Sequence, residues 1–352
     1  MIRLAAALIA AAMAHAQAPP GGYLFNDSHF HLTNYIQEGV PIIDFLKIMG
    51  TKAGRVALFG IPLQQQWSHR DSGDTAPTYY LDTDAPLYYY SFTDAYIAQV
   101  YLSLPVEQRR RFDPMITGFN PADMYAADHI RRVLLTFPGV FSGIGEFTIH
   151  KEFVSSKVAG DNASLQDPAL GRVLDFAGEV GLAVILHSDI DVPFPRKGAA
   201  PMYFAQMKAL LRKHSKTTII WAHTGVGRVI HPVDHHGRVL EEILRDPAFR
   251  HIHFDISWDL VARYIVESEQ TTRAAADLIN RYPERFLFGT DEVAPRTPEQ
   301  YFKVYEMYEP LWKLLTPDAS EKVRKGNYER IFDAARVRVR AWERAHAVKV
   351  AQ

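Results

Sequence analysis

Residues 23–32 read YLFNDSHFHL, an apolar run that ends in two histidines, His29 and His31. Side chains two apart on a β-strand point to the same face, so both imidazoles would lie on one side of a strand. Other apolar runs end in metal-binding side chains: Glu146 in VFSGIGEF, His187 in LAVILHSD, His223 in TTIIWAHTG and Asp291 in RFLFGTDE. In a parallel barrel the carboxyl ends of all strands open onto one face, so these side chains would converge there.

The apolar runs recur with a regular spacing that predicts the fold. Runs rich in Val, Ile and Phe lie near residues 24, 55, 112, 140, 182, 217, 251 and 286. Segments with helical periodicity separate them, for example 40–50 and 123–137. This alternation indicates an α/β protein, a (β/α)8 TIM barrel, with additional C-terminal helices expected in 298–315 and 319–346. A doubly wound open sheet is the competing architecture, but no GxGxxG motif follows the first run.

The first sixteen residues have the pattern of a secretory signal peptide. Arg3 supplies positive charge, an Ala-rich apolar stretch follows, and Ala14-His15-Ala16 is a small-x-small cleavage site. We therefore expect residues 1–16 to be removed and the mature protein to be exported, either periplasmic or secreted. Residues 17–352 contain no linker, repeat or low-complexity block, which predicts a single barrel domain.

The overall composition is that of an ordinary globular protein. Of the 352 residues, 47% are hydrophobic and 22% charged, and the formal net charge is -1. Such a balance provides no broad electrostatic field for nucleic acid or an anionic membrane, so the expected partner is a small-molecule substrate. Cys is absent, which excludes disulfides and thiolate ligands. The sequence does not distinguish a monomer from a homo-oligomer.

Two His-x-His triplets occur, and their positions in the apolar runs differ. His29 and His31 end their run, whereas His251 and His253 begin theirs. Functional residues of a barrel lie at the carboxyl ends of strands, while the opposite face usually serves stability. We therefore expect the first pair, and not the second, to bind a metal.

Three imidazoles and a carboxylate form a suitable ligand set for Zn²⁺, with Mn²⁺, Fe²⁺ and Co²⁺ as alternatives. Such a catalytic site retains an open position for water, whose pKa the ion lowers toward about 7. Each residue also has a simpler interpretation: a histidine at a strand end can be a hydrogen-bonded core residue, and Asp291 can cap the next helix. Gly289 and Thr290 before Asp291 would permit a close approach of the backbone.

Five motifs in this order resemble the amidohydrolase superfamily. They are DSHFHL, VILHSD, WAHTGVGR, FLFGTDE and the late GNYERIF. The resemblance is to the amidohydrolase-2 group, which includes the aminocarboxymuconate-semialdehyde and resorcylate decarboxylases. It implies that His29, His31, His187 and Asp291 bind the metal. It also implies that His223 polarises the substrate or transfers a proton.

Glu146 departs from the pattern of the wider superfamily. Many members carry a carboxylated Lys at the end of the fourth strand and hold two metals, whereas this chain has Glu146 in GIGEF. The position resembles the Glu of TatD-like deoxyribonucleases. Glu146 is equally well interpreted as a metal ligand or as a partner that orients a ligating histidine. We expect one divalent ion, and a second at Glu146 is left open.

The main functional hypothesis is metal-dependent hydrolysis of a small carboxylate-containing ester, lactone or amide. Asp291 would accept the proton of the attacking water, and His223 would stabilise the developing oxyanion. Arg70 and Arg196 lie on connections expected to face the pocket and could hold a substrate carboxylate. Two alternatives stay open: non-oxidative decarboxylation of a small carboxylic acid, and an exported barrel that binds a metal or ligand without catalysis.

Overall fold

The computed structural model describes residues 22–34, 37–61, 63–65, 87–89, 92–152 and 163–347. The predicted signal segment 1–16 and the predicted substrate ligand Arg70 lie outside these ranges. Among the helices in the described ranges, none combines the length and the apolar character needed to cross a membrane.

A parallel sheet forms the centre of the molecule. Its strands, in spatial order, are β10 (Phe286–Leu287), β9 (Ile252–Asp255), β8 (Ile219–Trp221), β7 (Ala183–Ser188), β6 (Gly143–His150), β5 (Phe112–Ile116), β2 (Ala53–Gly60), β1 (Phe25–Thr33) and β11 (Glu292–Val293). Both edge strands belong to one short segment, 286–293. Backbone hydrogen bonds join this segment to both neighbouring strands. Ile256 N, directly after β9, donates to Leu287 O (3.0 Å), and Asp291 N donates to His29 O of β1 (2.7 Å). The sheet therefore closes into a barrel, as the eight apolar runs predicted.

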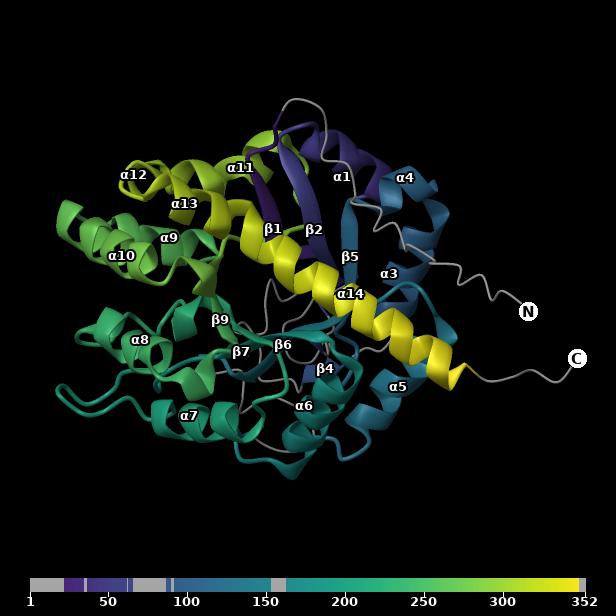
Figure 1. Cartoon of the computed structure of the whole chain (residues 1–352), viewed down its shortest axis with the longest axis horizontal. Coiled ribbons are helices and arrows are strands. Elements are labelled where there is room, and N and C mark those ends of the chain that lie inside the picture. Colours follow the sequence, from purple (N-terminus) through teal and green to yellow (C-terminus); the bar gives the residue numbers. More distant parts are fainter. Residues whose placement is uncertain are drawn as a thin grey trace, which may run out of the picture.

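Helices cover the outside of the barrel (Figure 1). Between the strands lie α1 (Ile42–Met49), α3 (Phe92–Ser103), α4 (Val106–Arg109), α5 (Ala126–Thr136), α6 (Pro168–Val180), α7 (Phe204–Lys213), α8 (His236–Arg245), α9 (Asp259–Val266) and α10 (Glu269–Arg281). A hairpin of β3 (Leu63–Gln65) and β4 (Leu87–Tyr89) lies on the long β2–α3 connection. The C-terminal helices are α11 (Pro298–Met307), α12 (Glu309–Trp312), α13 (Pro317–Glu321) and α14 (Asn327–His346), confirming the additional helices expected there.

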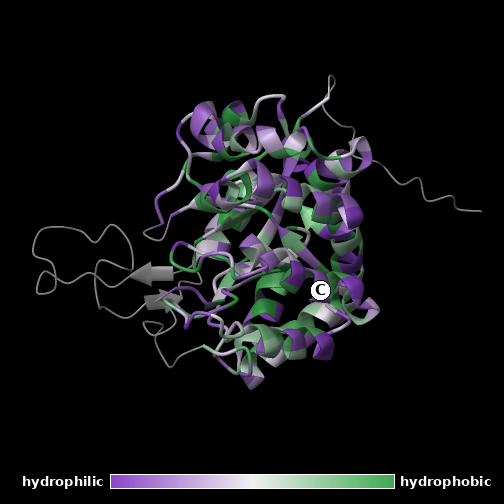
Figure 2. Cartoon of the chain, turned by 90° about the vertical axis from the view of Figure 1, so that its left-hand side faces the viewer, coloured by the Kyte–Doolittle hydropathy of each residue, from purple (hydrophilic) through white to green (hydrophobic). Residues whose placement is uncertain are grey.

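The strands alternate between an outward and an inward face, and this alternation positions the site. On β2, Val56 and Leu58 join the core under the helices, whereas Ala57 and Phe59 join a second cluster inside the barrel. Figure 2 shows hydrophilic residues on the outer parts of the helices and hydrophobic ones toward the interior. The inward cluster continues into α14, which crosses one end of the barrel in Figure 1. Because α14 fills that end, the opposite end is available for polar side chains.

Candidate metal centre

Four predicted residues meet at the carboxyl ends of the strands. His29, His31, Glu146 and Asp291 each offer one ligand atom, and these atoms all lie within 4.8 Å of one another. Asp291 Oδ1 is 3.1 Å from His31 Nε2 and 3.3 Å from His29 Nε2. Glu146 Oε2 lies 3.6 Å from both of these nitrogens. These four side chains from distant strand ends therefore lie within reach of one another, and we call these four residues the metal cluster.

His29 is oriented by a carboxylate behind it. Its Nδ1 lies 3.0 Å from Asp255 Oδ2, and because a carboxylate only accepts hydrogen bonds, Nδ1 must carry the hydrogen. Its Nε2 is buried and makes no hydrogen bond within the described part of the chain. A histidine that donates to a carboxylate through one nitrogen and presents the other to a cluster of acidic oxygens has the arrangement typical of a metal ligand.

His223 reaches the same place from β8 and is fixed in a similar way. Ser257 Oγ donates to Asp255 Oδ1 at 2.5 Å, so its lone pairs accept from His223 Nδ1, 2.9 Å away. The opposite nitrogen, Nε2, lies 3.3 Å from Glu146 Oε1 and 3.9 Å from Asp291 Oδ2. Nε2 is therefore the atom through which His223 can exchange a proton with the cluster.

His187 lies next to Glu146 of the metal cluster, and its role as a further metal ligand stays a prediction. Its Nδ1 is 2.5 Å from Glu146 Oε1, and its Nε2 is 3.3 Å from Asp189 Oδ1. With Glu146 and His223 it forms a second group of closely spaced ligand atoms. Glu146 belongs to both groups, so it connects His187 to the four-residue cluster. In this arrangement both imidazole nitrogens of His187 face carboxylates.

The backbone before Asp291 is held tightly against β1. Buried Asp27 accepts hydrogen bonds from the backbone N–H of His29 (3.0 Å) and of Thr290 (2.9 Å). Asp291 itself has φ 54°, in the left-handed region that non-glycine residues seldom adopt. A Cβ on Gly289 would lie 2.7 Å from His29 Cβ, so only glycine fits there. The close approach expected at Gly289 and Thr290 is confirmed.

The charges of the site favour a bound cation. Burial opposes an imidazolium at His29, yet Asp291 and Asp255 raise its pKa well above the ordinary value. Burial also opposes ionisation of Glu146, but Lys151 and His187 lower the pKa of that carboxyl well below its usual range. Ionised carboxylates that draw a proton onto a buried histidine also attract a metal cation. Because the donors are nitrogens and carboxylate oxygens, Zn²⁺ and other first-row divalent ions fit the site.

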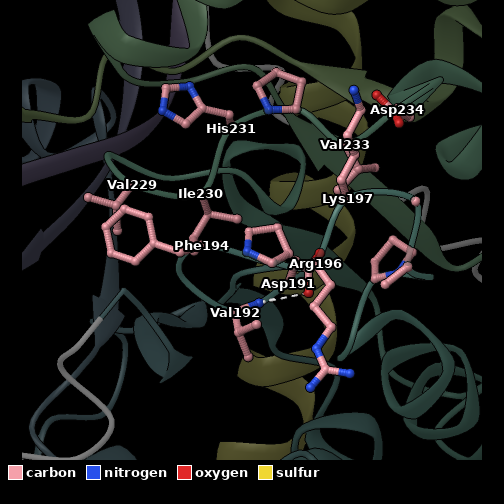
Figure 3. A pocket seen from close by; sticks show the side chains of 15 residues that line it. Asp191, Val192, Phe194, Arg196, Lys197, Val229, Ile230, His231, Val233 and Asp234 are labelled. Atoms are coloured by element: carbon pink, nitrogen blue, oxygen red, sulfur yellow. Dashed lines mark hydrogen bonds between the residues drawn. The ribbon is translucent and has the colours of Figure 1, made fainter.

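Arg196 lies away from this centre. It is exposed and lines a pocket of about 400 Å³ between residues 191–201 and 229–234, which none of the cluster residues lines. Figure 3 shows its guanidinium extending away from His231 and Asp234 on the other wall. The expectation that Arg196 reaches the substrate beside the metal therefore has no support in this arrangement.

Sequence reasoning did not identify the residues that position the histidines. Asp255, Ser257 and Asp189 are fully or almost fully buried. Asp255 ends the apolar run IHFD of β9, the same signal that identified Asp291. Neither His251 nor His253 belongs to a group of closely spaced ligand atoms in the part of the chain that the structure describes.

Comparison with known proteins identifies the family of the chain. The sequence pattern of a family described as amidohydrolase matches residues 27–334. The chain belongs to the amidohydrolase-2 family. Its matched region includes every residue of the metal cluster. A search among curated proteins finds no match to this amidohydrolase.

Solved structures share the fold of this amidohydrolase at low sequence identity. A putative 2-pyrone-4,6-dicarboxylic acid hydrolase from Pseudomonas putida matches with a TM-score of 0.53 and 14% identity, covering 89% of this chain and 98% of its own. 2,6-Dihydroxybenzoate decarboxylase from Rhizobium gives 0.51 and 13%, covering 89% and 99%. An amidohydrolase from Burkholderia multivorans with bound zinc gives 0.51 and 13%, covering 88% and 99%. At such identities the similarity establishes the fold alone.

Proposed function

We propose that this amidohydrolase is a metal-dependent hydrolase of a small carboxylate-containing ester, lactone or amide. The observation that carries the proposal is the position of Asp291. One of its carboxylate oxygens contacts His29 and His31, and the other faces His223 Nε2 at 3.9 Å. A single side chain thus joins the metal-binding histidines to a group that can exchange a proton.

The residues of the cluster divide into holding and proton-transferring roles. His29, His31, Glu146 and Asp291 would hold the ion. When bound, a divalent ion acts as a Lewis acid and lowers the pKa of water toward about 7. Asp291, whose side chain is 12% exposed, would accept the proton of the attacking water and then pass it to the leaving alcohol or amine. Because His223 already donates from Nδ1 to Ser257, it would donate from Nε2 to the developing oxyanion as the imidazolium, which carries a hydrogen on both ring nitrogens.

Non-oxidative decarboxylation is the second candidate, because the Rhizobium decarboxylase shares the fold as closely as the hydrolase from Pseudomonas does. The two reactions leave different products. The metal-loaded protein is incubated with carboxylated esters, lactones and amides and with aromatic acids. Hydrolysis yields an acid with its alcohol or amine and no gas, whereas stoichiometric CO₂ would support the decarboxylase and contradict our proposal.

The proton-transfer role is tested with Asp291→Asn. The amide cannot accept the proton, so we expect turnover to fall by about a hundredfold or more, with the thermal unfolding midpoint little changed. Asp191→Asn is the matched control, because Asp191 is a buried carboxylate on the loop after β7 and lies outside the cluster. Full activity of Asp291→Asn with every hydrolysed substrate would contradict the assigned role.

Export remains a separate proposal that depends on residues 1–16. If the segment is a signal peptide, the N-terminal sequence of protein recovered from the periplasm or medium begins near Gln17. Recovery of the intact N-terminus from the cytoplasm alone would contradict it.

A further inference from the structure

A pocket at the amino-terminal end of the barrel is lined by several positive charges. It has a volume of about 300 Å³ and lies between α4, the start of β5, the segment before β6 and the helix α14. Because β5 begins there, the pocket is at the end of the barrel opposite the metal cluster. Within the described ranges, its charged lining residues are Arg109, Arg110, Arg336, Arg340 and Asp113.

Three of these arginines act on a single side chain, the phenol of Tyr101, which also lines the pocket. Arg336 and Arg340 are four residues apart on α14, so they lie on one face of that helix. Arg109, the last residue of α4, has its Cζ 5.9 Å from the centroid of the Tyr101 ring. Burial and Asp113 raise the pKa of the Tyr101 hydroxyl, and all three arginines oppose that rise. The three cations are therefore gathered around one part of the pocket.

The carboxylates nearby balance these charges only in part. Arg340 and Arg110 pair with Glu343 and Glu107. Arg109 has no acidic partner in the described part of the chain, because its guanidinium donates to two backbone carbonyl oxygens. One positive charge beside the pocket is therefore left without a counter-charge.

Asp113 is shared between two guanidinium groups. It is fully buried and pairs with Arg336 and with Arg55. Arg55 has a second carboxylate partner, Asp333, whereas Arg336 has only the shared one among the described residues. Arg336 is thus the second lining arginine whose charge is incompletely matched.

Several donors beside the pocket have no acceptor within the described ranges. A guanidinium carries five N–H groups. Arg336 uses only Nη2, which donates to Asp113 Oδ1 and Phe112 O, and this leaves Nε and Nη1. Arg340 uses Nη1 and Nη2 and leaves Nε. The side chains of Arg336 and Arg340 are 32% and 21% exposed, so solvent reaches both only partly.

We propose that this pocket binds a phosphate group through Arg336, Arg340 and the hydroxyl of Tyr101, with the charge of Arg109 in support. A phosphate carries close to two negative charges and several acceptor oxygens, and arginine forms charge-assisted hydrogen bonds with such oxygens. The pocket is at the lower end of the about 300–1,000 Å³ typical of small-molecule sites, which suits inorganic phosphate or a small phosphate monoester. The bound group would join α14 to α4 and stabilise the folded state. This inference is independent of the reaction at the metal.

Calorimetric titration of inorganic phosphate into the zinc-loaded full chain, at constant ionic strength, tests the site. We expect Arg340→Gln to weaken phosphate binding by about tenfold or more, because one charged partner is lost. Tyr101→Phe should weaken it by about threefold or more, and since it removes only a hydroxyl it should fold normally. Arg344→Gln is the matched control, because Arg344 is exposed on the same helix and does not line the pocket.

The variants also separate this site from phosphate bound to the zinc ion. Equal binding in Arg340→Gln, Tyr101→Phe and Arg344→Gln would place the phosphate elsewhere and overturn the proposal, as would absence of binding to the unmodified protein. Glycerol phosphate in the same titrations distinguishes the two sources of the group. Tighter binding of the ester, weakened by Arg340→Gln, would assign the site to a phosphate monoester, and tighter binding of inorganic phosphate would assign it to the free ion.

Discussion

Asp255 is the residue on which the geometry of two histidines depends. One oxygen accepts from His29 Nδ1, and the other accepts from the backbone N–H of His223 at 2.7 Å and from Ser257. The side chain is fully buried, so each of these acceptor positions is filled by a protein donor. Its contribution to the site is to orient ligands that other strands provide.

We therefore expect Asp255→Asn to weaken metal binding. The asparagine NH₂ group must face either His29 Nδ1–H or the donors at the other oxygen, so one hydrogen bond is replaced by a donor–donor contact. A loss of about 10–100-fold in zinc affinity is expected, measured by competition with a chromophoric chelator. His253→Gln, on the same strand near its start, is the control; equal affinity in both variants would contradict the orienting role.

Asp94 predicts a pH dependence of stability unrelated to the metal. It is 1% exposed on α3, and burial raises its pKa to about 7, although the backbone N–H groups of Thr117 and Gly118 oppose the rise. The folded state then binds the proton more tightly than the unfolded chain, whose Asp pKa is near 3.8. The stabilisation of the folded state by protonated Asp94 is complete below about pH 4 and is lost as the pH rises toward 7.

Asp94→Asn should remove this loss of stability at higher pH. The asparagine carbonyl oxygen can still accept from the backbone N–H groups of Thr117 and Gly118, and the side chain carries no charge. Urea unfolding at pH 5 and pH 8 measures the effect, which we expect to be of the order of a few kcal/mol. The same pH slope in both proteins would show that Asp94 does not titrate in this range.

At the level of elements, the segment from β10 to β11 closes the barrel and presents Asp291. The sequence predicted one strand near residue 286. The structure divides it into two short strands on either side of Asp291, because the left-handed backbone there interrupts the ladder. The interruption places the carboxylate next to His31, four residues after Leu287, where the pairing of β10 with β9 ends.

Gly289→Ala tests how closely this segment must approach β1. The new Cβ would lie 2.7 Å from His29 Cβ and 3.1 Å from Ser257 Cβ, so backbone must move. We expect a loss of about 1–3 kcal/mol in the free energy of unfolding together with weaker zinc binding. Gly237→Ala on α8 is the control, since its nearest neighbour is Leu278 Cδ2 at 3.9 Å. Unchanged stability of the Gly289 variant would contradict the close-packing argument.

For the whole molecule, α14 fills the end of the barrel opposite the metal cluster. Tyr328, Ile331, Phe332 and Ala335 belong to the same buried cluster as the inward side chains of the strands. Tyr328 also donates a hydrogen bond to buried Asp113 at 2.8 Å. Arg55 and Arg336 form ion pairs with the same carboxylate. The barrel interior is therefore closed at one end by apolar packing and a paired charge.

Phe332→Ala should lower the free energy of unfolding by about 3–5 kcal/mol, as expected for loss of a buried aromatic ring. Urea denaturation measures this change. Val337→Ala, on the same helix and 69% exposed, should alter stability by no more than about 0.5 kcal/mol. Because Phe332 lies at the closed end, zinc affinity of the folded variant should match the unmodified protein, and a large loss of affinity would contradict the separation of the two ends.

The order of strands and helices and the convergence of His29, His31, Glu146 and Asp291 were readable from the sequence. Both follow from local periodicity and from the shared direction of parallel strands, which brings strand ends to one face. The place of His187 beside Glu146, and of Arg196 in a separate pocket, depends on side-chain directions and loop paths that no periodicity encodes. The roles of Asp255 and Ser257 arise from hydrogen bonds between β9 and residues of β1 and the β8 loop, far apart along the chain. Such contacts exist only once the barrel has closed, and they determine which nitrogen of each histidine faces the metal cluster.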